Sequence, residues 1–130
     1  MPLSHTARGA ITLLRGPLLR INSQTANYSI TAGESGTIFN NQAATGAVTF
    51  TLPAQVVGFW CIISSVEDQD VIIAADTVDT LAAFNDIAAD NIAINTSNEK
   101  VGAGVLIYSD GTNWVAMELM HDAQTAAIGT

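Results

Sequence analysis

The sequence predicts an all-β fold: a single-domain antiparallel β-sandwich or jelly-roll-like barrel with an extended N-terminal arm. Three observations predict it. Ile, Val and Thr, which favour strands, are abundant. Apolar and polar residues alternate with a period of two in several short runs. Turn-forming residues separate these runs at short intervals. The length of 130 residues is that of one domain.

The expected strands differ in how their apolar residues are spaced. In Val48–Leu52 three large apolar residues alternate with threonines until Pro53 ends the run, and residues 91–95 place two isoleucines on one face. Residues 59–64 and 71–74 are almost continuously apolar. Such runs are typical of strands that are covered on both faces.

Turn signals separate the expected strands. The clearest is Asp110-Gly111, which tolerates the positive φ of a tight hairpin and predicts one between residues 105–108 and 114–119. The other turn segments are 33–36, 40–41, 44–46, 67–70 and 96–99.

Two segments do not follow the strand pattern. Residues 80–90 carry apolar side chains at 81, 84, 87 and 88, a helical spacing that predicts a short helix or a long loop on the sandwich. The alanine-rich residues 121–130 are expected to be a mobile tail. The expected division is therefore an arm at 1–27, a sandwich domain at 28–120 and a tail at 121–130.

Charge divides the chain at the end of the arm. Residues 1–21 hold three arginines and no acid, whereas the remainder holds Lys100 and all 12 acids. The blander interpretation of this segment is a frayed terminus or an extra strand. The sharper one is an arm that docks on another subunit or a shell, because so many large apolar residues are unusual in a solvated tail. The residues predicted to make these contacts are Leu13, Leu14, Arg15, Leu18, Leu19 and Arg20.

The overall composition argues for an assembly component. The net charge of −8 argues against binding to a nucleic-acid backbone. Only 12% of residues are charged, against about 25% in an ordinary domain, while 48% are hydrophobic. The most apolar early stretch, Ile11–Ile21, is interrupted by Arg15 and Arg20, so neither a membrane span nor a signal peptide is expected. We expect synthesis in the cytoplasm.

No residue pattern nominates a catalytic, metal or cofactor site. Cys61, the single cysteine, lies in an apolar run and is expected to be a buried hydrophobic residue. His5 and His121 lie near the two ends. The acidic turn 67–70 lacks the glycine and the number of oxygens of a calcium loop, which favours a solvated hairpin tip. We therefore expect no enzyme activity, metal or cofactor.

Trp114 is the candidate aromatic contact. Strand alternation places it on one face with Glu118, which suggests that this face is the wetter one. An exposed tryptophan there could stack on a sugar or on a neighbouring subunit. The alternative is that Trp114 closes the end of the barrel over Tyr108.

Six short motifs follow one another along the body of the chain. They are Tyr28–Thr31, Gly36–Asn41, the TFTLP strand that ends at Pro53, the glycine-aromatic strand Gly58–Trp60, Val71–Ile73 and the closing SDGTNW hairpin of Ser109–Trp114. Each motif is weak alone because it encodes only a strand or a turn. Their order resembles the small β-rich virion proteins of tailed bacteriophages, over roughly residues 28–119.

The resemblance implies a homotrimeric head-decoration (cement) protein. Such a protein would lie on the outer surface of the expanded capsid, contact the major capsid protein and clamp neighbouring capsomers, without a cofactor. The alternative within the same resemblance is a receptor- or glycan-binding module of a tail fibre or tail tip.

Overall fold

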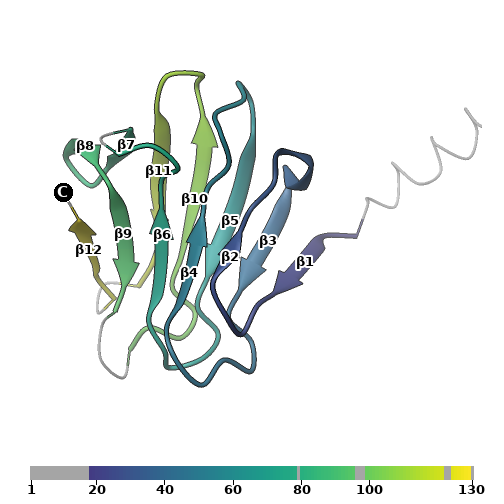
Figure 1. Ribbon diagram of the computed structural model, residues 1–130. Coiled ribbons are helices and arrows are strands. Elements are labelled where there is room, and N and C mark those ends of the chain that lie inside the picture. Colours follow the sequence, from purple (N-terminus) through teal and green to yellow (C-terminus); the bar gives the residue numbers. More distant parts are fainter. Residues whose placement is uncertain (1–17, 79, 96–98, 122–123, 130) are drawn as a thin grey trace, which may run out of the picture.

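The computed structural model is an all-β, sandwich-like structure of two sheets (Figure 1). It describes residues 18–78, 80–95, 99–121 and 124–129. One short 3₁₀ helix, η1 (Ala32–Glu34), lies between strands. In spatial order, sheet A contains β1 (Arg20–Ser23), β3 (Thr37–Asn40), β5 (Trp60–Ser64), β10 (Gly104–Ser109), β11 (Trp114–Leu119), β7 (Leu81–Ala83) and β8 (Asp86–Ala89). Sheet B contains β12 (Ala126–Gly129), β9 (Asn91–Ile94), β6 (Val71–Ala74), β4 (Val48–Thr51) and β2 (Tyr28–Ser29).

The sheets are mixed, so the prediction of an antiparallel sandwich is wrong for the first half of the fold. From β1 to β6 the chain alternates between sheet A and sheet B, and each strand pairs in parallel with the strand two before it. Parallel neighbours need a long crossover, which is usually a helix. Here the crossover is the intervening strand of the opposite sheet. The six strands therefore make three turns of a flattened parallel coil.

The second half of the fold contains the antiparallel pairs. β10 and β11 form the hairpin that the Asp110-Gly111 turn predicted. Asp110 Oδ1 accepts hydrogen bonds from the backbone N–H groups of Thr112 and Asn113 at 2.8 and 2.7 Å. Gly111 has a φ of 95°, which a glycine adopts without a Cβ penalty.

Residues 81–89 form neither a helix nor a long loop. They form the hairpin β7–β8, which turns at Phe84 and Asn85 with φ values of 48° and 72°. Two central residues with positive φ are the geometry of the tight turns that match the twist of paired strands. β7 also pairs with β11 in parallel. These long-range pairings override the helical spacing of the apolar residues.

Both ends of the described chain belong to the sheets. β12 pairs antiparallel with β9, so the expected mobile tail is wrong for residues 126–129. β1 extends sheet A beside β3. This part of the expected arm is therefore an extra strand, which was the blander of the two interpretations. Leu13, Leu14 and Arg15 lie outside the described residues.

The core lies between the two sheets. In sheet B, Phe50, Ile73 and Ile92 align across neighbouring strands and are fully buried. From sheet A, Phe39 packs against Phe50 with ring centroids 5.7 Å apart. Each fully buried side chain of this kind stabilises the fold by about 1.5–3 kcal/mol. The core thus fixes which residues of each strand face outward.

Candidate functional site

The outer face of sheet A carries a continuous row of large apolar side chains. Phe39, Ile63 and Ile107 are fully buried in the core, so the residues between them along each strand face away from it. The strand register aligns these outward residues across five strands. The row consists of Ile21, Ile38, Ile62, Leu106 and Met117.

A second row widens this surface, because Trp60, Tyr108 and Val115 align beside the first row. On the other side the apolar surface ends: Leu119 aligns with a glycine and three polar residues, namely Gly104, Ser64, Asn40 and Ser23. Several of these side chains are substantially exposed, among them Ile21 (55%), Met117 (52%) and Trp60 (38%). In the described part of the chain, these rows contain no Lys, Arg, Asp or Glu. We call this surface the sheet A outer face.

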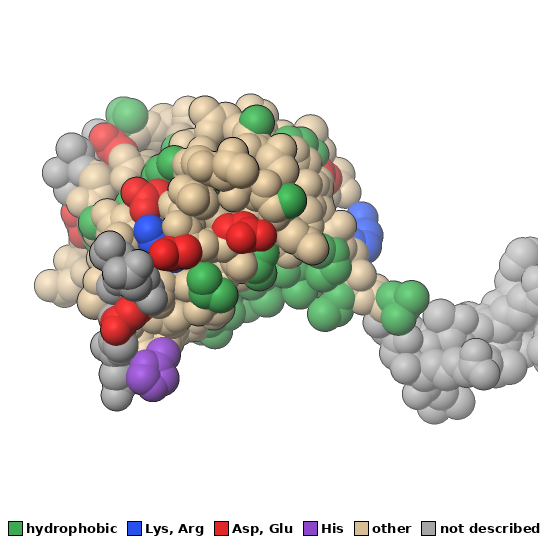
Figure 2. Space-filling view, turned by 90° about the horizontal axis from the view of Figure 1, so that it is seen from below, with side chains coloured by type: hydrophobic (Ala, Val, Ile, Leu, Met, Phe, Trp, Pro, Cys, Tyr) green, Lys and Arg blue, Asp and Glu red, His purple; other side chains and the backbone are tan. Residues whose placement is uncertain are grey.

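Figure 2 shows the same concentration of apolar side chains from below. Hydrophobic side chains form a band along the lower edge of the view, which continues toward the point where the described chain begins. Acidic side chains gather elsewhere in this view, over the connecting loops. In this view the apolar band and most of the acidic side chains occupy different parts of the surface.

The outer face of sheet B is different in character. One of its rows consists of Thr49, Ile72, Ala93 and Ala127. The next contains Thr51, Ala74, Asn91 and Gly129. Ile72 is the one large apolar residue in these two rows of described residues. Sheets that have one face in water normally carry polar or small residues there, and sheet A departs from that pattern.

The predicted contact residues that the structure describes lie at the edge of the sheet A outer face. Leu18 is 95% exposed and Leu19 is 66% exposed, directly before edge strand β1. Arg20 begins β1, and its guanidinium donates to the Ser35 carbonyl. A Cβ added to Gly36 would lie 3.7 Å from both Arg20 Nη2 and Trp60 Cζ2, so these two side chains flank that glycine.

Glu34 connects this edge strand to the rest of the fold. Glu34 Oε2 accepts hydrogen bonds from Asn22 Nδ2 of β1 (2.9 Å) and from the Tyr28 hydroxyl of β2 (2.8 Å). Its Oε1 accepts from the backbone N–H and the hydroxyl of Thr31, which completes a capping box at η1. Desolvation alone would raise the pKa of Glu34, but these hydrogen bonds together lower it below its usual value of 4.5. Sequence reasoning did not identify this carboxylate.

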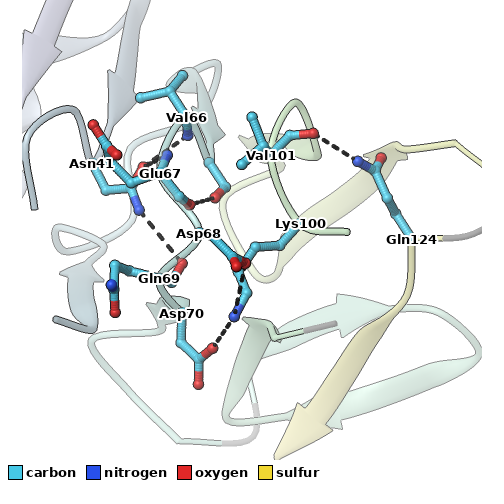
Figure 3. Close-up of polar contacts among 10 residues, drawn as sticks. Asn41, Val66, Glu67, Asp68, Gln69, Asp70, Lys100, Val101 and Gln124 are labelled. Carbon is cyan, nitrogen blue, oxygen red and sulfur yellow. Dashed lines mark hydrogen bonds and ion pairs between the residues drawn. The ribbon is translucent and has the colours of Figure 1, made fainter. Parts of the chain in front are cut away.

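A second polar cluster joins the loops at the opposite end of the strands (Figure 3). The Lys100 ammonium, whose side chain is only 9% exposed, lies 2.8 Å from an oxygen of Asp70 and 3.7 Å from one of Asp68. The hydrogen bond to Asp70 contributes most to raising the pKa of Lys100. Asn41 Oδ1 accepts from the backbone N–H groups of Val66 and Glu67 at 2.8 and 3.2 Å.

This cluster explains the acidic turn 67–70. The turn is not the hairpin tip that the sequence predicted, because β5 and β6 belong to different sheets. Two of its three carboxylates, those of Asp68 and Asp70, pair with Lys100, which comes from the loop before β10. Lys100 and Asp70 are 30 positions apart in the sequence. No pattern of neighbouring residues could therefore have predicted this ion pair. The arrangement ties loops together and is structural.

The predicted aromatic contact at Trp114 is wrong. Trp114 is fully buried, and its ring packs edge-on against Phe59 with centroids 5.4 Å apart. It therefore cannot stack on a sugar or on a neighbouring subunit. The exposed aromatic residues of sheet A are Trp60 and Tyr108, which align on adjacent strands.

The remaining candidates for chemistry are the Cys61 thiol and the side chains that could bind a metal ion. Cys61 is fully buried, and this burial, with a smaller contribution from the charge of Glu34, raises the pKa of its thiol to about 12. Within residues that the structure describes, no three His, Cys, Asp or Glu side chains gather into a group that could hold a metal ion. No helix in this part of the chain is both long and apolar enough to span a bilayer.

No family model matches the sequence, and no curated protein matches it significantly. The resemblance to phage virion proteins therefore rests on the order of the motifs alone. The sheet A outer face is the other feature that points to a function.

Proposed function

We propose that this protein is a structural component of a tailed-phage virion that decorates and stabilises the outer surface of the capsid by bridging neighbouring capsomers. The single observation that carries the proposal is the sheet A outer face, a broad apolar surface next to the exposed Leu18 and Leu19. A contiguous apolar surface of this kind marks a site of protein–protein contact. The motif order supports the phage context.

The stabilising mechanism would be mass action. A protein that binds the assembled lattice but not the separate capsomers shifts the equilibrium away from disassembly. The proposed partners are the major capsid protein and further copies of this chain, in the homotrimer that the resemblance implies. Several modest contacts held in one oligomer gain strength because each raises the effective concentration of the next.

The proposed role of the N-terminal residues is contact with the shell. In this proposal Leu13, Leu14 and Arg15 join Leu18 and Leu19 in that contact. Arg20 joins them in this proposal, since it is exposed at the start of β1 while its guanidinium donates to the Ser35 carbonyl.

Co-sedimentation with expanded phage heads that lack this protein tests the proposal. The wild-type full chain is expected to pellet with the heads. A variant in which the four leucines of the N-terminal contact set are replaced by serine should bind more than ~10-fold more weakly, because each buried leucine contributes about 1.5–3 kcal/mol. Ile87→Ser is the matched control, since Ile87 is exposed (81%) and lies on β8. Wild-type protein that stays in the supernatant, or a leucine variant that binds as well as the control, would contradict the proposal.

The alternative function is a receptor- or glycan-binding module of a tail fibre or tail tip. The observation that favours it is the pair Trp60 and Tyr108, which are 38% and 37% exposed on adjacent strands. Exposed aromatic rings are a common platform for sugars. Selective binding on a glycan array that is lost in Trp60→Ala would support this alternative. The copy number also separates the two functions, with hundreds of copies per virion expected for the head and few for the tail.

A further inference from the structure

We propose that the sheet A outer face is the interface between copies of this chain. The inference deepens the proposed function, on which it rests for the assumption that the protein works in an assembly. It assigns self-association to a particular surface, whereas the sequence pointed only to the N-terminal residues.

The residue types on this face are those of a sheet interior. The inner faces of both sheets pack through Ile, Val and Phe, and the outer row of sheet A again consists of Ile, Leu and Met side chains. Two sheets pack through such faces at a separation of about 10 Å. A second copy packed against this face would add another layer of the kind that already exists inside the molecule.

Charge favours a second copy of this chain as the occupant. The formal net charge is −8, so two copies repel each other when they approach through their acidic surfaces. The rows of the sheet A outer face contain no charged residue among those described, and the Arg20 guanidinium lies at their edge beside Trp60, where it donates to the Ser35 carbonyl. Two copies can therefore meet through the centre of this face without desolvating an ion. An interface built for a basic partner would instead present acidic side chains at this surface.

The size of the face fits the centre of such an interface. Its first row crosses five strands that lie about 4.8 Å apart, its second row crosses three of them, and the face spans about five residues at ~3.3 Å each. The projected area is therefore roughly 300 Å², and the relief of the side chains raises the accessible area above that value. A stable interface buries about 800 Å² on each partner. Leu18 and Leu19 extend the apolar surface beyond β1 toward that size.

The test is the mass of the full chain by sedimentation velocity at micromolar concentration. The wild-type protein is expected to sediment as a homo-oligomer of the 13.6 kDa chain. In Met117→Glu the oligomer's dissociation constant should rise by ~100-fold or more, because a carboxylate is then buried without a partner. The matched control is Val101→Glu, since Val101 is exposed to the same degree (54%) but lies on a loop away from this face. The control should sediment like the wild type.

A second variant keeps the test decisive if Met117→Glu does not fold. Ile21→Glu places the same charge on β1, at the opposite side of the face. Circular dichroism and a cooperative thermal transition show which variant is folded. A monomeric wild type, or a folded Glu variant that associates as tightly as the control, would overturn the interface. Failure to bind phage heads while association depends on Met117 would instead reject the proposed function alone.

Discussion

Replacing Glu34 by glutamine should loosen the attachment of the first two strands. One oxygen of Glu34 accepts hydrogen bonds from Asn22 of β1 and Tyr28 of β2, and the other accepts two from Thr31. Glutamine keeps the size of the side chain and one acceptor oxygen. Its amide nitrogen faces one N–H donor and one hydroxyl, however, so one charge-assisted hydrogen bond is lost and a second is replaced by a neutral bond in which the hydroxyl accepts.

The expected loss follows from those two bonds. A hydrogen bond to a charged group contributes about 1.5–3 kcal/mol when buried, and Glu34 is half-buried, so its bonds contribute less. We expect Glu34→Gln to lower the free energy of unfolding by about 2 kcal/mol at pH 7. For a domain of this length that corresponds to a decrease in Tm of about 5–10 °C.

The effect should depend on pH in a defined direction. The pKa of Glu34 is lower in the folded protein than the usual 4.5. Its contribution to stability is therefore complete above pH 4.5 and is lost as the pH falls through the folded-state pKa. The difference between wild type and Glu34→Gln should be largest at neutral pH and should shrink in acid.

Urea unfolding at a series of pH values, followed by circular dichroism, measures this difference. Glu118→Gln is the control, because it makes the same chemical change at an exposed position near the end of β11, where the four hydrogen bonds of Glu34 are not involved. A double-mutant cycle with Tyr28→Phe should give a coupling energy of about 1 kcal/mol. Equal stability of the Glu34 and Glu118 variants at pH 7, or a difference that grows in acid, would refute the reasoning.

Three further predictions concern buried groups. Trp114→Ala should lower the free energy of unfolding by about 3–5 kcal/mol in urea titrations because it empties a core site, whereas Trp114→Phe, which removes an indole N–H without a partner among described residues, should cost less. Lys100→Met should lower the free energy of unfolding by about 1–2 kcal/mol. Because the pKa of Lys100 in the folded protein is raised above 10.5, this difference should persist through neutral pH and disappear as the pH rises through the folded-state pKa. Cys61 should not react with a thiol reagent in the native protein, since it is fully buried and its pKa is about 12, but it should react when urea unfolds the chain. Rapid labelling of the native protein would contradict its burial.

Local signals in the sequence predicted local structure well. The Asp110-Gly111 turn and the alternation in Val48–Leu52 depend on a few consecutive residues, and both lie where the pattern placed them. The all-β, sandwich-like class follows from the same signals. The functional prediction for the N-terminal residues stays a prediction, because Leu13, Leu14 and Arg15 lie outside the described residues.

Long-range pairing explains where the sequence misled. Parallel and antiparallel strands share the same alternation, so nothing in Val48–Leu52 indicates that β4 pairs in parallel with β6. The helical spacing in residues 81–89 gave way to the hairpin β7–β8, which is fixed by pairing with β11. The exposure of Glu118 does not extend to Trp114 on the same face, because Trp114 is buried at the start of β11 and Glu118 is exposed near its end.

The composition predicted the kind of surface but not its place in the fold. The sparse charge and high apolar content predict a surface covered by other chains, and this stays a prediction. The particular surface could not be found, because the row from Ile21 to Met117 is assembled from five strands that lie far apart in the sequence. The connection of β1 through Glu34 was hidden for the same reason.

Hydroxyl-radical footprinting read by mass spectrometry tests the central claim most directly. In the isolated chain Trp60 and Tyr108 are more than one-third exposed, so both should be oxidised if the sheet A outer face is free. We predict that both are protected in the wild-type protein and become oxidised in a folded Met117→Glu variant. Equal oxidation of these two rings in both proteins would show that no second copy covers the face.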